Sequence, residues 1–343
     1  MLTSIRLLNF KTHRDTEIKL GRLTVLVGPN GAGKSSVLQA IGLAGKPVDP
    51  KRPQPADNVV ARWSPFTTIP RDGEAVATCT VQLAGHFSDA SAWQWPAEKP
   101  FLRGTDARII AELQSALLVP NPTRMADAVP ITAIAPKLAS DGAGLADVIA
   151  SMRDGDDIGF QALQASLRAV VPQIEKIGIR RRSIEVNKIA HELMFDVSGR
   201  KGIPAAQMSG GTLLALAILA LLHSPQRPRI LLLDDIDHGL HPKAQWDLLK
   251  QLRRLLAQYP DLQIVATSHS PDLVDELDPS EVVVMALRAD GTSAAKPLTA
   301  CPREDMLGVL RAGQLWSAVG EDWVTADPPA TQTAPADPTE PQP

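Results

Sequence analysis

The feature that most constrains this chain is a glycine-rich segment near its N-terminus. Residues 28–35 read G-P-N-G-A-G-K-S and match the phosphate-binding pattern G-x-x-x-x-G-K-[ST] without a mismatch. A short apolar, β-branched run of strand type, 23–27, comes directly before the segment, and residues 36–41 continue as a helix. Strand, glycine loop and helix follow one another in the order that a phosphate site requires. We therefore expect an α/β fold built around this loop.

The residue types in the loop have a direct chemical reason. Glycines let the backbone come close to phosphates, and the amides of the loop and of the helix N-terminus present positive partial charge to them. We expect Lys34 to contact the β and γ phosphates of ATP and the Ser35 hydroxyl to bind Mg²⁺. The predicted nucleotide-binding residues of this segment are Gly28, Pro29, Asn30, Gly31, Ala32, Gly33, Lys34, Ser35 and Ser36.

Composition excludes several other classes of protein. A hydrophobic fraction of 44% and a charged fraction of 21% are typical of a globular chain with a substantial core. The formal net charge of −3 argues against a surface dominated by non-specific phosphate binding. The most apolar stretch, 213–222, is about half of what a bilayer requires, and the N-terminal residues lack a signal-peptide cleavage pattern. With Cys79 and Cys301 far apart, we expect a cytoplasmic protein without a membrane span or a disulfide.

The chain divides by pattern into three parts. Residues 1–85 and 172–322 alternate strands and helices, which predicts a split nucleotide-binding domain with a mixed, largely parallel sheet flanked by helices. Residues 86–171 are expected to form a helical insertion. Apolar spacing there predicts helices over 106–119, 144–152 and 156–170. Residues 323–343 are rich in proline and poor in apolar side chains, so this tail is expected to be disordered.

Polar side chains end two of the predicted parallel strands. Residues 229–233 form an apolar strand that is followed by Asp234 and Asp235. Carboxylates at the C-terminal tip of a parallel strand point into the crevice where phosphate and Mg²⁺ lie. We expect Asp234 to organise Mg²⁺ through its waters and Asp235 to orient an attacking water; a pair of helix-capping aspartates is the alternative. His269 ends the strand that begins at residue 263, and is a candidate contact to the γ phosphate.

A second anion site is predicted at the start of the apolar helix after residue 208. Ser209 is a natural N-cap, and the amides of Gly210 and Gly211 follow it at the helix start. The basic run Arg180-Arg181-Arg182 lies in a predicted strand. Such a run is typical of a solvated strand face, with a nucleic-acid or partner contact as the alternative.

Taken in order, the glycine loop, Met-Ser-Gly-Gly at 208–211, Leu-Leu-Leu-Asp-Asp at 231–235 and Thr-Ser-His at 267–269 resemble the ABC-type ATPase heads of the SMC, RecF and OLD group. In that family these motifs are Walker A, the signature, Walker B and the switch histidine. The segment Ile-Asp-His-Gly-Leu-His-Pro at 236–242 resembles stand-alone bacterial AAA-family ATPases related to OLD and RecF, and Arg6 to Lys11 resembles their first strand. The likeness is confined to residues 1–45 and 190–285.

The resemblance implies that ATP hydrolysis needs two copies of the chain. In such heads the signature of one subunit completes the ATP site of the other, so Ser209 and Gly211 are expected to touch the γ phosphate bound at the partner copy. His241 falls where transporters of this class carry an aspartate. The family usually has Glu after the Walker B Asp, whereas this chain has Asp235, one methylene shorter. Because a misplacement of about 1 Å costs on the order of a hundredfold in rate, we expect slow hydrolysis and a long-lived ATP-bound homodimer.

Two functions fit this sequence. The first is an ATP-dependent switch or sensor whose dimer presents the insertion to an effector protein encoded by a neighbouring gene, as in anti-phage systems. The second is a DNA repair or recombination ATPase like RecF, which binds DNA directly and would use Arg180 to Arg182. A transporter subunit is disfavoured because about 100 residues of different character stand where a compact helical subdomain is usual.

Overall fold

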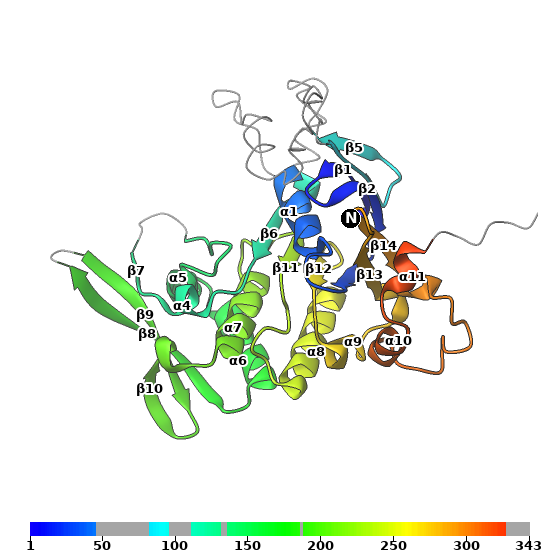
Figure 1. Ribbon diagram of the computed structural model, residues 1–343. Helices are drawn as coiled ribbons and strands as arrows, with labels where there is room; N and C mark the ends of the chain where they lie inside the picture. The colour runs from blue at the N-terminus through cyan, green and yellow to red at the C-terminus, as the bar shows by residue number, and fades with distance from the viewer. Residues whose placement is uncertain (46–81, 96–110, 132–135, 186–187, 327–343) are drawn as a thin grey trace, which may run out of the picture.

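The computed structural model describes residues 1–45, 82–95, 111–131, 136–185 and 188–326. Its centre is a six-stranded sheet in the order β14-β13-β3-β12-β11-β6 (Figure 1). The five strands from β13 to β6 run parallel to one another. Strand β14 pairs antiparallel with β13 at the edge of the sheet. The strands are β3 (Leu23–Val27), β6 (Ser115–Leu118), β11 (Ile230–Leu233), β12 (Gln263–Thr267), β13 (Val282–Leu287) and β14 (Ser293–Pro297). The predicted α/β class with a mixed, largely parallel sheet is confirmed.

Alternation along the strands produces a separate core on each face of this sheet. On β11, Ile230 and Leu232 join one hydrophobic cluster, whereas Leu231 and Leu233 join the other. This is the period-two pattern of a strand that is buried on both sides. One cluster lies under the helix α1 (Lys34–Ala44) through Val37 and Ile41. The sheet therefore has helical cover on both faces, and the carboxyl ends of its parallel strands remain at one edge.

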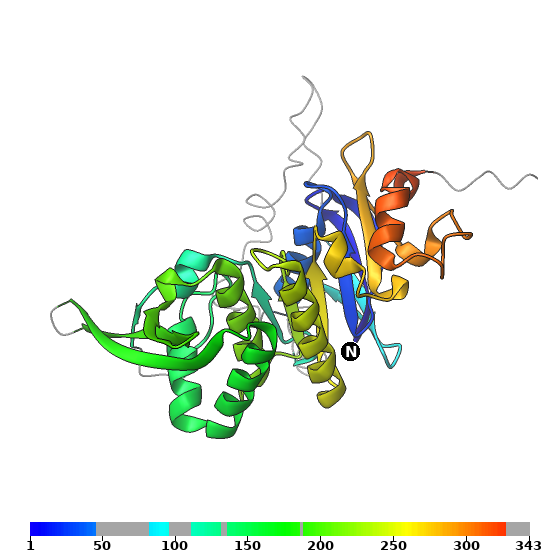
Figure 2. The ribbon, with the colours of Figure 1, turned by 90° about the horizontal axis from the view of Figure 1, so that it is seen from below.

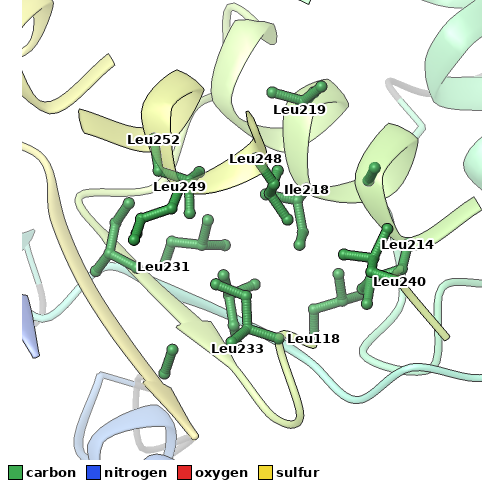
Figure 3. Packing of buried hydrophobic residues seen from close by; sticks show 14 of the residues in the cluster. Leu118, Leu214, Ile218, Leu219, Leu231, Leu233, Leu240, Leu248, Leu249 and Leu252 are labelled. Atoms are coloured by element: carbon green, nitrogen blue, oxygen red, sulfur yellow. The ribbon is translucent and has the colours of Figure 1, made fainter. Parts of the chain in front are cut away.

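The opposite face is covered by long helices. The helices α7 (Gly210–His223) and α8 (Pro242–Gln258) pack Leu214, Ile218, Leu248 and Leu252 against the Leu231 and Leu233 side of the sheet (Figure 3). Helix α7 is apolar on every side because it is buried on every side, which explains the run that the sequence shows at 213–222. In the described residues no helix is both long and apolar enough to cross a membrane.

A second, antiparallel sheet carries the N-terminus. Its order is β2-β1-β4-β5, and it packs over α1 in the cluster that holds Leu2, Ile5 and Leu7. The strands are β1 (Leu2–Phe10), β2 (His13–Lys19), β4 (Gln82–Phe87) and β5 (Ala92–Trp95). Residues 46–81, which lead into β4, lie outside the described residues. The turn between β1 and β2 reaches the glycine loop, as described below.

A second lobe stands beside the central sheet (Figures 1 and 2). It contains α4 (Pro122–Ala126), β7 (Val129–Pro130), α5 (Leu145–Gly155), α6 (Asp157–Val170), β8 (Ile174–Glu185), β9 (Lys188–Val197) and β10 (Arg200–Pro204). The helices predicted at 144–152 and 156–170 are confirmed, and the Asp156 side chain accepts a hydrogen bond from the Gly159 amide as an N-cap. Strands β8 and β9 form a hairpin that projects from the lobe in Figure 2.

The helix predicted over 106–119 is wrong at its C-terminal part. Residues 115–118 form β6, a parallel strand beside β11, and residues 106–110 lie outside the described part of the chain. The sequence Ser-Ala-Leu-Leu is a short apolar run that fits a buried helix or a buried strand equally well. Its conformation is therefore decided by its pairing with β11. Strand β6 therefore places part of the range 86–171 in the central sheet, and that range is not helical throughout.

Helix α9 (Pro271–Val274), which precedes β13, and two helices that follow β14 lie at the β13–β14 end of the sheet. The two are α10 (Ala312–Val319) and α11 (Asp322–Thr325), with α10 packed against α9 and α11 against β13 (Figure 2). The tail predicted to begin at residue 323 begins later, because α11 continues to Thr325 and buries Val324. Residues 327–343, on which the expectation of disorder chiefly rests, lie outside the described residues.

Candidate active site

Backbone geometry explains the glycines of the loop at residues 28–35. Gly28, Gly31 and Gly33 have φ angles of 135°, 82° and 94°, which other residues rarely adopt. A Cβ atom on Gly28 would lie 2.1 Å from the carbonyl oxygen of Met285 on β13. The loop therefore passes directly against the neighbouring strand, and only glycine allows that approach.

Lys34 begins α1 and is buried, with 5% of its surface exposed. Its ammonium donates hydrogen bonds of 2.9 Å to the carbonyl oxygens of Gly28 and Pro29. Burial lowers the pKa of this group, while Asp235, Asp234, Glu321 and Asp237 act in the opposite direction. A buried ammonium held by two neutral carbonyls is well placed to receive an anion.

Asp234 lies at the centre of a hydrogen-bond network that joins two strand ends to the glycine loop. The Ser35 hydroxyl donates to Asp234 Oδ1 at 2.8 Å, and the Thr267 hydroxyl donates to the same oxygen at 2.8 Å. Thr267 Oγ1 in turn accepts the backbone amide of Asp235 at 2.8 Å. Thr267 is fully buried at the end of β12. One side chain of β12 therefore orients both aspartates that follow β11.

Asp235 and His269 face each other across the ends of β11 and β12. His269 Nε2 lies 3.8 Å from Asp235 Oδ1, and the two side chains are 41% and 48% exposed, respectively. Desolvation raises the pKa of Asp235, the negative charge of Asp234 raises it further, and His269 lowers it. Asp235 has a φ of 49°, in the left-handed region that aspartate tolerates better than most residues. With 48% of its side chain exposed, Asp235 is partly open to solvent.

These side chains surround a cleft of about 330 Å³. Its lining residues are Lys11, Thr12, Asn30, Gly31, Gly33, Lys34, Ser35, Ser36, Asp235 and His269. The structure thus brings together most of the residues predicted from the glycine loop and both predicted catalytic residues. Gly28, Pro29 and Ala32 lie in the loop but not in the lining, and Asp234 lies behind Ser35.

The oxygen atoms at this cleft fit Mg²⁺. Ser35 Oγ and Asp234 Oδ1 are hard oxygen donors, and Mg²⁺ is commonly held by one or two such groups together with waters and substrate phosphates. Within the described residues no group of three or more His, Cys, Asp or Glu side chains could hold a metal ion. The donor set therefore suits a cation that arrives with a nucleotide and keeps several waters.

The predicted signature residues lie elsewhere on the molecule. Ser209 caps α7, because its Oγ accepts the amide of Thr212 at 3.2 Å, and it is exposed outside the cleft lining. Gly211 is buried, and a Cβ atom on it would lie 2.2 Å from the carbonyl oxygen of Gly239. Of the two residues expected to touch a partner's phosphate, Ser209 has its side chain at the surface. Gly211 is buried at the helix start, where it packs against the backbone of Gly239.

His241 is exposed and caps α8, with its Nδ1 accepting the Lys243 amide at 3.3 Å. A structural role is therefore enough to account for it.

Sequence reasoning missed several residues that form the site. Lys11 and Thr12 enter the cleft from the turn between β1 and β2, and Lys11 also hydrogen-bonds Gln39. Glu321 approaches from the C-terminal helices closely enough to act on the pKa of Lys34. Thr267 was inside the Thr-Ser-His motif but had no assigned role. No spacing rule joins these positions, since only folding places them around one loop.

Two family models match the chain. One, described as an AAA domain, putative AbiEii toxin, Type IV TA system, matches residues 135–275. The other, described as an AAA ATPase domain, matches residues 1–49. The two matches fall on either side of a long intervening segment, and each contains part of the cleft described above.

The chain also resembles curated proteins over short stretches. It is 49% identical over 43 residues to the OLD nuclease of Thermus scotoductus, which covers 12% of this chain and 8% of that protein. It is 32% identical over 109 residues to the DNA double-strand break repair Rad50 ATPase of Methanopyrus kandleri, covering 32% of this chain and 10% of that protein. The matched stretches therefore span no more than a tenth of either relative's length.

Solved structures extend the likeness to most of the chain. An SMC head bound to the C-winged helix domain of ScpA matches with a TM-score of 0.54 at 15% identity, covering 86% of this chain and 96% of that one. Together, the family models, the short relatives and this fold make the chain similar to the ABC-type ATPase heads of the SMC, RecF and OLD group. An Smc head domain with an extended coiled coil, bound to the C-terminal domain of ScpA from Pyrococcus furiosus, matches with a TM-score of 0.50 at 13% identity, over 87% and 96% of the two chains. At these identities the solved structures support only the fold of the chain, and they do not indicate its partners or its role.

Proposed function

We propose that this ATPase head binds MgATP in the cleft and hydrolyses it slowly within a homodimer. The observation that carries this proposal is the network in which Asp234 accepts hydrogen bonds from Ser35 and Thr267 beside the buried ammonium of Lys34. Such a pairing of a loop hydroxyl with a strand-end carboxylate is what a Mg²⁺-bound triphosphate requires. The residues that hold the nucleotide are then Lys34, the amides of the loop, and Ser35 with Asp234 through Mg²⁺.

Hydrolysis transfers the γ phosphoryl group to water. A water oxygen bonds to the γ phosphorus, the bond from that phosphorus to the β–γ bridging oxygen breaks, and ADP leaves with the electron pair. When bound, Mg²⁺ offsets negative charge on the phosphates. Asp235 orients the attacking water and accepts its hydrogen bond, and His269 faces the same space from β12. Lys34 stabilises the charge that develops on the transferred group.

Two properties of Asp235 favour slow turnover. Its side chain is one methylene shorter than glutamate, and it follows Asp234 directly on a left-handed backbone. Burial and the charge of Asp234 raise its pKa, so its carboxylate form is less favoured than that of an ordinary aspartate. A protonated or short carboxylate positions water poorly. The ATP-bound state is therefore expected to persist.

The dimer follows from the separation of the two half-sites. The cleft exposes Asp235 and His269, while Ser209 is exposed at the start of α7 and does not line the same cleft. In the proposed homodimer the Ser209 end of each α7 covers the cleft of the other copy, so that bound ATP joins the two heads. Gly211 contributes by allowing α7 to start directly against Gly239.

In the cell we propose that this ATP-dependent dimer is a switch, in anti-phage defence, for an effector protein encoded by a neighbouring gene. The family description that names a putative AbiEii toxin and a Type IV TA system supports a role of this class. The second lobe with its projecting β8–β9 hairpin is the surface that such an effector would recognise.

Direct DNA binding is the second candidate function, because the β8 arginines are exposed and the Rad50 relative is a DNA repair ATPase. Arg180 is 57% and Arg182 is 60% exposed, but both lie near the Glu192 carboxylate, at 2.6 and 3.6 Å. That pairing offsets part of their charge. Three results would favour this function. DNA binding should require ATP, weaken with salt, and be lost when Arg180, Arg181 and Arg182 are replaced by alanine. Arg303, which is 52% exposed and paired with Asp305, is the matched control.

Size-exclusion chromatography with light scattering tests the central proposal. Asp235→Asn with MgATP should elute as a dimer, and the same protein without nucleotide should elute as a monomer. Lys34→Ala should stay monomeric because it loses the nucleotide, and Ser209→Arg should stay monomeric while still binding ATP. Arg303→Ala is the control for an unrelated surface change. A monomer under every condition would refute the dimer mechanism, and a wild-type chain that binds no ATP would refute the proposed function.

A further inference from the structure

Three segments far apart in the sequence meet at the last residues of the glycine loop. The carbonyl oxygen of Ala32 accepts a hydrogen bond from Ser293 Oγ on β14 at 2.9 Å. The carbonyl oxygen of Gly33 lies 3.1 Å from His13 Nε2 at the start of β2. Both side chains are buried, with 0% of His13 and 1% of Ser293 exposed. Two consecutive peptide groups of the loop are therefore held by side chains from outside it.

The protonation of His13 follows from its surroundings. Burial lowers the pKa of its imidazole to about 4, with Lys11 acting in the same direction, so the ring is neutral near pH 7. A neutral ring carries one proton, and because Nε2 faces a carbonyl oxygen, that proton is on Nε2. The remaining nitrogen, Nδ1, is buried without a hydrogen-bond partner in the described part of the chain. His13 is thus held as a donor to Gly33 at the cost of an unpaired acceptor.

Ser293 is connected in the same way. Its hydroxyl has one proton, and it lies 2.7 Å from Thr12 Oγ1 as well as 2.9 Å from the Ala32 carbonyl oxygen. A carbonyl oxygen can only accept, so the consistent arrangement is a chain in which Thr12 donates to Ser293 and Ser293 donates to Ala32. The Ser293 amide also donates to the Thr12 carbonyl oxygen at 2.8 Å. The β1–β2 turn and β14 therefore form one rigid support.

Thr12, His13 and Ser293 pack tightly against Gly33 of the loop. A Cβ atom on Gly33 would lie 2.6 Å from Ser293 Oγ and 2.7 Å from both His13 Nε2 and Thr12 Oγ1. Gly33 is also the N-cap position of α1, and it provides no side-chain cap for that helix. These outside contacts therefore hold the helix start together with the Ser36 and Val37 amides, which also donate to the Gly33 carbonyl.

The direction of the amides follows from peptide geometry. In a trans peptide the carbonyl of one residue and the amide of the next point in opposite directions. Holding the Ala32 and Gly33 carbonyls toward Ser293 and His13 directs the amides of Gly33 and Lys34 to the opposite side. Gly33 and Lys34 line the cleft. These are the amides that a helix N-terminus presents to an anion.

We propose that His13 and Ser293 are positioning residues for nucleotide binding, which hold the Ala32 and Gly33 carbonyls so that the next amides face the phosphates of the nucleotide. This inference rests on the proposed function, since it assigns the anion to a nucleotide. It adds two residues that touch neither nucleotide nor metal and that lie outside the glycine loop and the strand ends.

Three variants separate positioning from simple packing. Ser293→Ala removes one donor with little change in volume, and His13→Leu removes the other. His13→Gln retains an amide N–H where His13 Nε2 lies, and it should rescue the loss. His191→Leu and Ser166→Ala are matched controls, since both are buried and hydrogen-bonded in the second lobe. Ser293→Ala and the histidine pair test the inference independently, so one unstable variant does not prevent the test.

Hydrogen exchange of the nucleotide-free protein gives the first readout. In Ser293→Ala and His13→Leu, we expect faster exchange in the peptide that covers residues 28–36. Exchange in the β11 peptide should stay unchanged. This measurement needs no bound nucleotide. Unchanged exchange in the loop of Ser293→Ala would overturn the inference whether or not the chain binds ATP.

Nucleotide binding and steady-state kinetics give the second readout. Each donor loss should weaken ATP binding by about tenfold, as expected for the loss of one buried hydrogen bond to a loop carbonyl. In His13→Leu the Gly33 carbonyl keeps its bonds from the Ser36 and Val37 amides, so the loss there is one of orientation. The loss should raise the KM for ATP with kcat nearly unchanged, because loop amides contact the phosphates in both ground and transition states. A general folding defect would instead lower the active fraction and leave KM unchanged, and that result overturns the inference. If the wild type binds no ATP, the proposed function fails as well.

Discussion

The Ser35 hydroxyl donates a 2.8 Å hydrogen bond to Asp234 Oδ1, across 199 positions of the sequence. This bond joins the start of α1 to the end of β11, and it shares its acceptor oxygen with Thr267 of β12. Two hydroxyl donors from different elements thus hold one carboxylate oxygen in place. The same oxygen is then available to a divalent cation when Ser35 turns toward a bound nucleotide.

Replacing Asp234 by asparagine should separate nucleotide binding from Mg²⁺ binding. The amide keeps the size of the side chain but removes the negative charge, so Mg²⁺ affinity of the ATP complex should fall by at least about tenfold. In the wild type, removal of Mg²⁺ with EDTA should weaken ATP binding, whereas Asp234→Asn should respond little to EDTA. Isothermal titration calorimetry with and without EDTA measures both. Equal EDTA sensitivity of the two proteins would show that Asp234 does not serve the metal.

Thr267 should matter for catalysis although it does not reach the cleft. Thr267→Val keeps the shape of the side chain but removes its bonds to Asp234 Oδ1 and to the Asp235 amide. We expect turnover to fall by about 10- to 100-fold, as for residues that orient metal-binding groups. An unsatisfied buried amide should also lower the free energy of unfolding by about 1–3 kcal/mol. Thr267→Ser should restore turnover, and failure of that rescue would assign the effect to packing alone.

Lengthening the side chain at position 235 should accelerate hydrolysis. Asp235→Glu extends the carboxylate by one methylene toward a water that Asp235 holds imperfectly, so kcat should rise by up to about a hundredfold. The ATP-bound dimer should become correspondingly short-lived. Stopped-flow phosphate release and the dimer lifetime on dilution provide the two measurements. An unchanged or slower kcat in Asp235→Glu would show that side-chain length is not the cause of slow turnover.

The acidic limb of the pH–rate profile should report Asp235. Because its pKa is raised above the usual 3.8, the carboxylate form is lost, and the rate falls, at a higher pH than for an ordinary aspartate. His269 lowers this pKa, so His269→Gln should move the limb to higher pH. Asp237 raises it, so Asp237→Asn should move the limb to lower pH. Limbs that shift in the same direction in both variants would contradict this electrostatic assignment.

His13 should make the protein sensitive to acid. Its folded-state pKa of about 4 is below the ordinary 6.5, so the unfolded chain binds the proton more readily. The stability that its neutral form contributes is complete above pH 6.5 and is lost as the pH falls toward 4, by up to about 3 kcal/mol. Urea unfolding of the wild type and of His13→Gln between pH 4 and 7 tests this. Parallel stability curves for the two proteins would rule out His13 as the source.

Much of the fold was predictable because its signals are local. The strand at 23–27, the glycine loop and α1 are contiguous, and β11 with Asp234 and Asp235 is a continuous apolar run with two carboxylates at its end. Strand β6 was not predictable in the same way. Its four residues have no periodicity of their own, and the parallel pairing of Leu117 with Leu232 decides their conformation.

The sequence by itself predicted a phosphate site at residues 28–35, and it determined that carboxylates and a histidine lie at the same edge of a parallel sheet, because the carboxyl ends of parallel strands meet there. Only the tertiary structure decided how the loop is held. Thr267 orients two aspartates, and His13 and Ser293 hold two loop carbonyls. These contacts join residues up to 261 positions apart, and hydrogen-bond geometry at such separations depends on how β2, β12 and β14 pack around the loop rather than on any spacing in the chain.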